Sequence, residues 1–157
     1  MIKIRRAELK DAPAILNIFV SSIRELAKGY YSDDQIAVWA GRLTLEKIHQ
    51  AITVDETCIA EINGTPAGYG QLDISTGIIE AVFVLPEFKR QGVGSAILKH
   101  IEEVARANGI NTLRLRSSLN AFEFYKHLGY EETERIVHCA DGIEFDCINM
   151  KKDIRHE

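Results

Sequence analysis

Cysteine and proline are both scarce in this sequence. It has three of each among 157 residues, and Cys58, Cys139 and Cys147 are widely spaced without a Cys-x-x-Cys pair. Small secreted scaffolds need many paired cysteines, so this pattern excludes that class. An odd set of isolated thiols is typical of free cysteines in a reducing compartment.

Long apolar runs and an excess of basic residues are also missing. No segment approaches the roughly 18 apolar residues that cross a bilayer, and the N-terminal segment lacks the apolar run of a signal peptide. Lys and Arg number 19 against 23 Asp and Glu, which gives a net charge of −4. General nucleic-acid binders are normally basic. We therefore expect a cytoplasmic protein with neither a nucleic acid nor a membrane as its partner.

The length and composition fit one globular domain, which we expect to span residues 1–157. Hydrophobic residues make up 46% of the chain and charged residues 27%, as in ordinary soluble domains. A chain of this size can bury about two-thirds of its surface on folding. It therefore needs no disulfide or metal to stabilise its core.

Apolar periodicity predicts the order of the secondary-structure elements. Alternating residues indicate strands, and apolar residues three and four positions apart indicate helices. The pattern favours a mixed sheet covered by helices, an α/β or α+β sandwich. The expected strands are 2–6, 57–61, 66–72, 78–84, 112–116, 131–139 and 144–150, the last two joined through Asp141-Gly142; the expected helices are 11–29, 32–40, 44–52, 92–108 and 118–128.

Capping and turn residues mark several of these boundaries. Asp11, Thr44 and Ser118 are expected to cap helices, and Ser32 with Gln35 forms a capping-box pattern. The Asn63-Gly64 pair is the strongest hairpin signal in the chain.

The segment 82–96 is the most informative part of the chain. An apolar strand runs into a basic loop with Gly92 and Gly94, and the loop opens a long helix. Free N–H groups at a helix start bind anions, and Lys89 and Arg90 add positive charge there. A plain strand-to-helix turn is one alternative. A dinucleotide-binding turn needs a third glycine where Ile97 stands, and no P-loop motif is present.

Two motifs resemble those of the GCN5-related N-acetyltransferases (GNAT). Residues 89–94 resemble the family's Q/R-x-x-G-x-G/A motif, with Lys89 in place of the usual Gln or Arg. Residues 121–130 resemble its A-x-x-F-Y-x-x-x-G-F/Y signature, and residues 31–40 look like those of a small bacterial single-domain subgroup. The resemblance implies a mixed, mostly antiparallel sheet of six to seven strands, splayed between strands four and five and flanked by helices.

The resemblance also implies acetyl-CoA as cosubstrate. It would lie in a cleft between the strands 78–84 and 112–116, with its pantetheine along the strand 78–84 and its pyrophosphate on the glycine loop. The residues carried over to this site are Val82, Phe83, Val84, Lys89, Arg90, Gln91, Gly92, Val93, Gly94, Ser95 and Asn120.

Tyr125 and Glu80 are the candidate catalytic residues. Tyr125 matches the family's general acid, which protonates the departing thiolate. Glu80 is the candidate base for the incoming ammonium, acting directly or through water, and period two along its strand places it on the face of Val82 and Val84. The alternatives are a tyrosine packed in the core, and a carboxylate at the surface or paired with an arginine.

Three aromatic residues are candidates for the acceptor site. Tyr30, Tyr31 and Trp39 fall in a region that often covers the acceptor in this family, although packing between short helices explains them equally well. The histidines show no metal-ligand spacing, so we expect no metal. None of the three cysteines falls near the cleft motifs, so we expect no covalent cysteine intermediate.

The resemblance thus implies direct acetyl transfer from acetyl-CoA to an unidentified primary amine in a ternary complex. Two alternatives stay open, namely a catalytically silent acyl-CoA-binding module and an enzyme that acetylates proteins. Members of this family often dimerise, so a homodimer is a further expectation.

Overall fold

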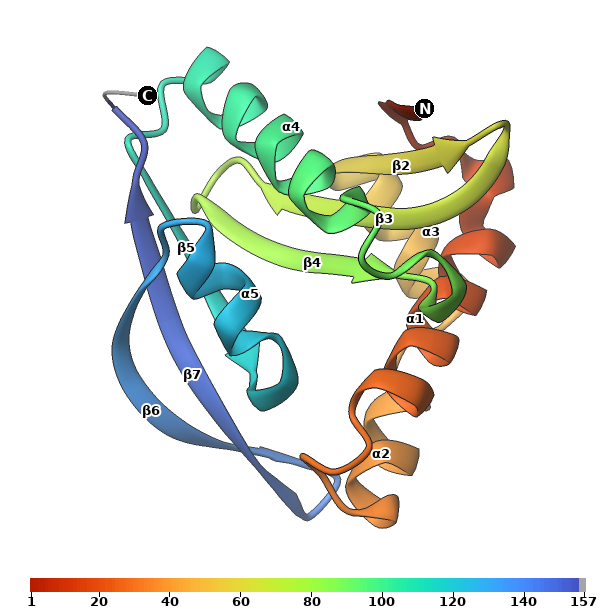
Figure 1. Ribbon diagram of the computed structural model, residues 1–157, viewed down its shortest axis with the longest axis vertical. Helices are drawn as coiled ribbons and strands as arrows, with labels where there is room; N and C mark the ends of the chain where they lie inside the picture. Colours follow the sequence, from red (N-terminus) through yellow and green to blue (C-terminus); the bar gives the residue numbers. More distant parts are fainter. Residues whose placement is uncertain (156–157) are drawn as a thin grey trace.

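The computed structural model describes residues 1–155, so the last two residues of the predicted domain, 156 and 157, lie outside the described residues. Its elements follow the predicted order (Figure 1). The strands are β1 (Ile2–Arg6), β2 (Glu56–Ile62), β3 (Thr65–Asp73), β4 (Ile78–Val84), β5 (Thr112–Ser118), β6 (Glu131–Ala140) and β7 (Ile143–Asp153). The α-helices are α1 (Ala12–Leu26), α2 (Asp33–Ala40), α3 (Leu45–Val54), α4 (Val93–Ala107) and α5 (Phe122–His127). Short 3-10 turns cover Leu9–Asp11, Pro86–Phe88 and Leu119–Ala121.

All seven strands join one mixed sheet in the order β1-β2-β3-β4-β5-β7-β6. Neighbouring strands are antiparallel except β4 and β5, which are parallel. This arrangement confirms the expected mixed, mostly antiparallel sheet.

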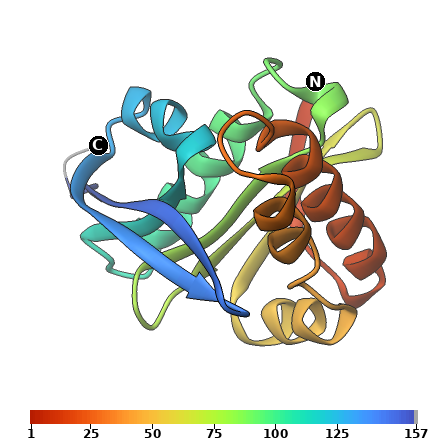
Figure 2. The ribbon, with the colours of Figure 1, turned by 90° about the horizontal axis from the view of Figure 1, so that it is seen from below.

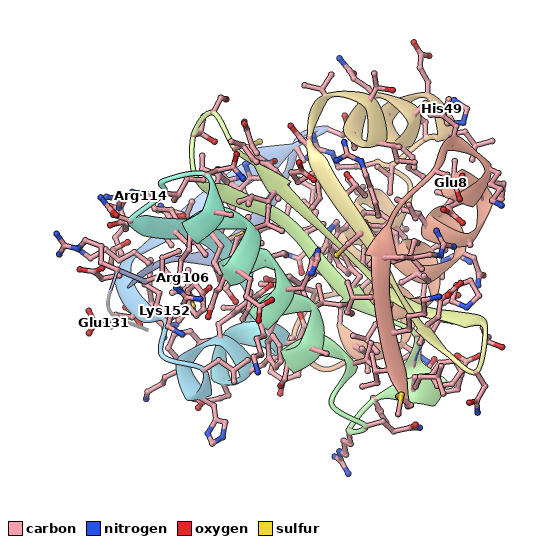
Figure 3. All side chains as sticks on the ribbon, turned by 90° about the horizontal axis from the view of Figure 1, so that it is seen from above. Glu8, His49, Arg106, Arg114, Glu131 and Lys152 are labelled. Carbon is pink, nitrogen blue, oxygen red and sulfur yellow. The ribbon has the colours of Figure 1, made fainter. Side chains whose placement is uncertain are left out.

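Helices cover both faces of the sheet. On one face α1 buries Ile15, Ile18 and Ile23 together with residues of α2 and α3. On the other face α4 buries Ile97 and Ile101 against β3 (Figure 3). A Cβ on Gly70 of β3 would approach Ile97 Cγ2 to 2.5 Å, so glycine is what lets α4 lie this close. Figure 2 shows the β6–β7 hairpin on one side of the molecule and α1, α2 and α3 on the other.

Several predicted turns and caps are present as expected. Asn63 and Gly64 have φ angles of 51° and 80°, the left-handed pair of a tight hairpin turn. Ser32 and Gln35 form the reciprocal capping box, because the Ser32 Oγ accepts from the Gln35 N–H and the Gln35 Oε1 accepts from the Ser32 N–H. Thr44 caps α3 by accepting from the Lys47 N–H.

Two predicted caps are wrong. Asp11 precedes α1, but its carboxylate accepts from both terminal nitrogens of Arg5 at 2.8 Å and from the Glu8 N–H. The bidentate ion pair with the guanidinium uses both carboxylate oxygens and so takes them away from the first N–H groups of α1. Ser118 makes no capping bond either, because a 3-10 turn separates it from α5.

The sheet splays open between β4 and β5, as expected. Only Ile78 and Ile79 of β4 pair with β5, opposite Arg114 and Leu115. Beyond this point β4 continues beside β3 while β5 continues beside β7, and the two strands diverge (Figure 1). The divergence leaves the backbone edges of both strands free to line a cleft.

Candidate active site

A cleft of about 620 Å³ opens where β4 and β5 diverge. It is bounded by the outer half of β4, the start of α4 and the segment that leads into α5. Ten of the eleven residues expected to hold the cosubstrate line it: Val82, Phe83, Val84, Lys89, Arg90, Gly92, Val93, Gly94, Ser95 and Asn120. Gln91 does not line it, and its Nε2 donates to the Glu87 carbonyl instead.

The glycine loop forms the basic end of this cleft. Arg90 and Gly92 both adopt left-handed backbone conformations, with φ of 63° and 83°. Such a conformation is uncommon for arginine and is typical of binding sites. A Cβ on Gly92 would meet only Ile2 Cδ1, at 4.0 Å, so the φ angle rather than crowding favours glycine here. The loop turns the chain into α4, whose first N–H groups form a site for an anion.

Asn120 supplies an unused acceptor on the same cleft. Its Oδ1 is buried, and it has no hydrogen-bond partner in the part of the chain that the structure describes. Leaving such an atom unpaired costs about 1–3 kcal/mol. An amide N–H of a bound molecule would satisfy it, and the pantetheine arm of CoA carries amide groups of this kind. The cleft therefore fits the expected cosubstrate at both its anionic and its amide parts.

Tyr125 lies in the wall of the cleft on α5. Its ring is 7% exposed and packs edge-to-face against Phe124 and Tyr130, with ring centroids 5.1 and 5.9 Å away. No hydrogen bond to its hydroxyl is found within residues 1–155. Burial raises the pKa of the phenol well above its usual value, so the hydroxyl stays protonated.

Glu80 occupies an irregular position in β4. The register between β3 and β4 shifts here, since Gln71 pairs with Ala81 and Leu72 pairs with Ile79, which leaves Glu80 without a partner. Such a β-bulge breaks the alternation of side chains and often re-aims a residue at a site. The prediction that period two places Glu80 on the face of Val82 is therefore wrong. Ile79 takes that face instead, in the core beneath α4.

The surroundings of Glu80 suit a proton acceptor. Partial burial, together with the negative charges of Asp55 and Asp73, raises the pKa of its carboxyl, and the positive charge of Arg116 opposes this shift. A carboxylate with a raised pKa is a better base than an ordinary one, since it holds a proton more firmly. Glu80 lines the cleft and also a second cavity that continues from it.

The second cavity has a volume of about 450 Å³ and aromatic walls. Phe83 of β4 is central to these walls, with ring centroids 5.1 Å from Phe19, 5.7 Å from Tyr69 and 6.4 Å from Trp39. The two cavities meet at the residues that line both of them: Trp39, Glu80, Ala81, Phe83, Arg116 and Ser118.

The three predicted aromatic residues have different surroundings. Tyr30 is 56% exposed and lines the first cleft, whereas Trp39 lines both cavities. Tyr31 is buried, and its hydroxyl donates to the Asp146 carbonyl and accepts from the Leu119 N–H. Burial raises the pKa of Tyr31 to about 12. Its hydroxyl thus holds the segment that precedes α2 against β7, while its ring forms part of the second cavity.

Several further polar residues line the second cavity and were not predicted as site residues: Arg42, Gln71, Arg116, Ser118, His138 and Cys147. They come from separate parts of the chain and belong to no short motif. The sequence held a signal only for Arg116, namely the alternation of polar and apolar residues along the strand 112–116. The expectation that no thiol lies near the site is wrong for Cys147. Burial raises the pKa of this thiol, which favours the neutral, weakly nucleophilic form.

Residues 1–155 contain no group of three or more His, Cys, Asp and Glu side chains arranged to hold a metal ion. None of the helices in this part of the chain has the length and apolar character to span a membrane.

Curated relatives of this chain are N-acetyltransferases. An uncharacterized N-acetyltransferase of Methanocaldococcus jannaschii is 27% identical over 143 residues, which cover 83% of this chain but only 61% of the relative. A thialysine N-epsilon-acetyltransferase of Bos taurus is 30% identical over 149 residues, covering 83% of this chain and 85% of the relative.

Solved structures share the fold over nearly the whole chain. A GCN5-related N-acetyltransferase from Rhodopseudomonas palustris superposes with a TM-score of 0.92 at 28% identity, covering 96% of this chain and 94% of the other. A PaiA N-acetyltransferase from Thermoplasma acidophilum, solved in complex with coenzyme A, has a TM-score of 0.81 at 22% identity and covers 98% and 99%.

A family model gives the same assignment. The model described as an acetyltransferase (GNAT) domain matches residues 27–154. The match includes the glycine loop, the signature around Tyr125 and the bulged strand that carries Glu80. This chain therefore belongs to the GNAT family of N-acetyltransferases, the enzymes that transfer an acetyl group from acetyl-CoA to an amine.

Proposed function

We propose that this chain acetylates a small primary amine by direct attack on acetyl-CoA in a ternary complex. The observation that carries the proposal is the meeting of two cavities at Glu80. One has a basic glycine loop and Tyr125, and the other has aromatic walls. Donor and acceptor can thus enter from different sides and meet beside a base and an acid.

The first cleft supports binding of the cosubstrate. Lys89, Arg90 and the N–H groups at the start of α4 offer positive charge and donors to the pyrophosphate. Asn120 offers its unpaired Oδ1 to an amide N–H. The T. acidophilum neighbour, which was solved with coenzyme A, has the same fold, and its likeness agrees with this use of the cleft.

The second cavity supports a role for Glu80 in preparing the amine. An alkylammonium has a pKa near 10, so the amine needs to lose a proton before it attacks. Glu80 accepts that proton, directly or through a water molecule. Aromatic rings line the cavity beside this carboxylate.

Tyr125 acts on the sulfur that leaves the acetyl group. A bond forms between the amine nitrogen and the acetyl carbon, and the bond between that carbon and sulfur breaks. Tyr125 donates its proton to the thiolate that leaves, and the resulting phenolate regains a proton from solvent. Acid catalysis of this kind contributes about 10²–10⁴-fold to a rate.

A small acceptor fits the second cavity better than a protein does. The cavity volume of about 450 Å³ is within the range of pockets that bind small molecules. The bovine relative is named for a small amine, thialysine, which agrees with this choice. A silent CoA-binding module would need neither a base nor an acid at the meeting point of the two cavities.

The setting and assembly form part of the same proposal. The seven-stranded sheet runs from residue 2 to residue 153, which supports one catalytic domain. All three cysteines are free, which agrees with the reducing cytoplasm. A homodimer is proposed from the family's habit, with the outer edge of β6 as the candidate contact, and light scattering tests it.

A turnover assay tests this function. CoA release from acetyl-CoA would be followed with a panel of small amines and, separately, with lysine-containing peptides. We expect turnover with at least one small amine and little with peptides. Turnover with peptides alone would establish the protein-modifying alternative, and binding of acetyl-CoA without turnover on either panel would establish the silent module.

A further inference from the structure

A cluster of two arginines and a histidine lies in the wall of the second cavity. Arg42 follows α2, Arg116 lies on β5 and His138 lies on β6. The Arg42 Nη1 is 3.3 Å from the His138 Nε2, and the Arg116 Nη1 is 3.2 Å from the His138 Nδ1. Three separate elements therefore bring two guanidinium groups to one imidazole ring.

This cluster has too few acceptors for its donors. A neutral imidazole has one ring nitrogen that accepts and one that carries a proton, so it can accept from only one of the two arginines. A protonated imidazole accepts from neither and adds a third positive charge. Burial and the charges of Arg116 and Arg42 lower the pKa of His138, which keeps the ring neutral. One guanidinium contact therefore faces an N–H whichever tautomer is present.

No acidic side chain in the described part of the chain relieves this arrangement. Among residues 1–155, neither Arg42 nor Arg116 forms an ion pair with an acidic side chain. Glu80 lines the same cavity and is affected by the charge of Arg116, but the two are not paired. The cavity thus has a carboxylate and two guanidinium groups with unused donors, and aromatic rings also line its walls.

We propose that the acceptor is an amino acid in the broad sense, a primary amine whose other end carries a carboxylate bound by Arg42 and Arg116. This inference rests on the function proposed above and names the class of its substrate. The amine lies at Glu80, and the carboxylate takes the guanidinium donors that His138 cannot accept. Guanidinium groups match carboxylates in shape and charge. A polyamine, by contrast, would place a positive charge against two arginines.

Matched amines of equal length test the proposal. The ω-amino acids from glycine to ε-aminocaproate would be compared with their amides and with diamines of the same chain length, and kcat/KM would be measured for each. A charge-assisted bond to a carboxylate should favour the best acid over its amide by about tenfold or more. The diamine of that length should be the poorest of the three.

Variants locate the effect in the cluster. Arg42→Gln and Arg116→Gln should each bring the ratio of acid to amide close to one. Arg114→Gln is the matched control, because Arg114 is an exposed arginine on the same strand but lies at the outer edge of the molecule, in neither cavity (Figure 3). This variant should keep the wild-type ratio. An equal loss in all three variants would mean a general charge effect and would overturn the proposal.

Binding of acetyl-CoA, measured by calorimetry on the same samples, distinguishes a failure of the carboxylate inference from a failure of the proposed function. If acetyl-CoA binds and amides or diamines are used as well as acids at every length, only the carboxylate inference fails. The same holds if acetyl-CoA binds and none of the acids is acetylated. If acetyl-CoA does not bind the folded wild-type protein, the proposed function fails and the inference with it.

Discussion

Two neighbouring tyrosines allow catalysis and stability to be separated by the same small change. Tyr125 and Tyr130 pack edge-to-face, with ring centroids 5.9 Å apart, and both rings are buried. Tyr125 lines the cleft, whereas the Tyr130 hydroxyl donates to the Glu102 Oε2 at 2.8 Å in the core. Removing each hydroxyl should therefore have opposite consequences.

Tyr125→Phe should lower kcat by about 10²-fold or more, because no other acid would protonate the leaving thiolate at short range. The ring and its packing remain, so the free energy of unfolding should change by less than about 0.5 kcal/mol. The Kd for acetyl-CoA should also stay close to the wild-type value. Single-turnover kinetics, which isolate the chemical step, are the appropriate assay.

Tyr130→Phe should instead cost stability and leave the chemical step intact. A buried hydrogen bond to a charged group contributes about 1.5–3 kcal/mol, and the low end applies because Lys152 still contacts Glu102 at 3.2 Å. For a chain of this length the Tm should fall by about 3–6 °C. Figure 3 shows Lys152 and Arg106 together at this end of α4. An unchanged chemical step in Tyr125→Phe would refute the assignment of Tyr125 as the acid.

Three further changes test other parts of the structure. Glu80→Gln should remove the acidic limb of the pH–rate profile. In the wild type this limb should lie above the ordinary carboxyl pKa, because partial burial and Asp55 raise the pKa of Glu80. A wild-type profile in the variant would exclude Glu80 as the base. Gly92→Glu should weaken acetyl-CoA binding, measured by calorimetry, by far more than Gly64→Glu. Gly64 is the control because its φ of 80° is similar and it lies outside the cleft. Equal losses in the two variants would refute the role of the glycine loop in phosphate binding. Asp11→Asn should destabilise the fold by about 1.5–3 kcal/mol above pH 4, because Arg5 lowers the pKa of Asp11 in the folded state. This difference, measured by urea unfolding, should vanish as the pH falls further. A difference that grows in acid would contradict the ion pair.

The sequence was sufficient for the elements whose signals are local. Strand alternation, the Asn63-Gly64 turn and the Ser32–Gln35 capping box depend on residues a few positions apart, and each is present in the structure. The glycine loop and the Tyr125 signature were recognised in the same way. The wrong caps show the limit of such signals, since the carboxylate of Asp11 is taken by Arg5 on the adjacent strand.

The parts of the site that the sequence did not reveal depend on contacts between distant segments. The bulge at Glu80 depends on the register between β4 and β3, so the sequence of β4 alone does not predict it. Arg42, Arg116 and His138 meet only because the α2–α3 connection, β5 and β6 surround one cavity. Cys147 reaches that cavity because β7 lies beside β5.

Binding of acetyl-CoA is the measurement that tests the central claim most directly. A thermal-shift titration of the wild-type protein would compare acetyl-CoA and CoA with NAD and ATP. At about 100 times its Kd, a ligand adds roughly 2.7 kcal/mol of stability, which raises the Tm of a chain this size by several degrees. We expect a saturable rise with acetyl-CoA and CoA and none with NAD or ATP. A folded sample that shows no rise with acetyl-CoA would contradict it.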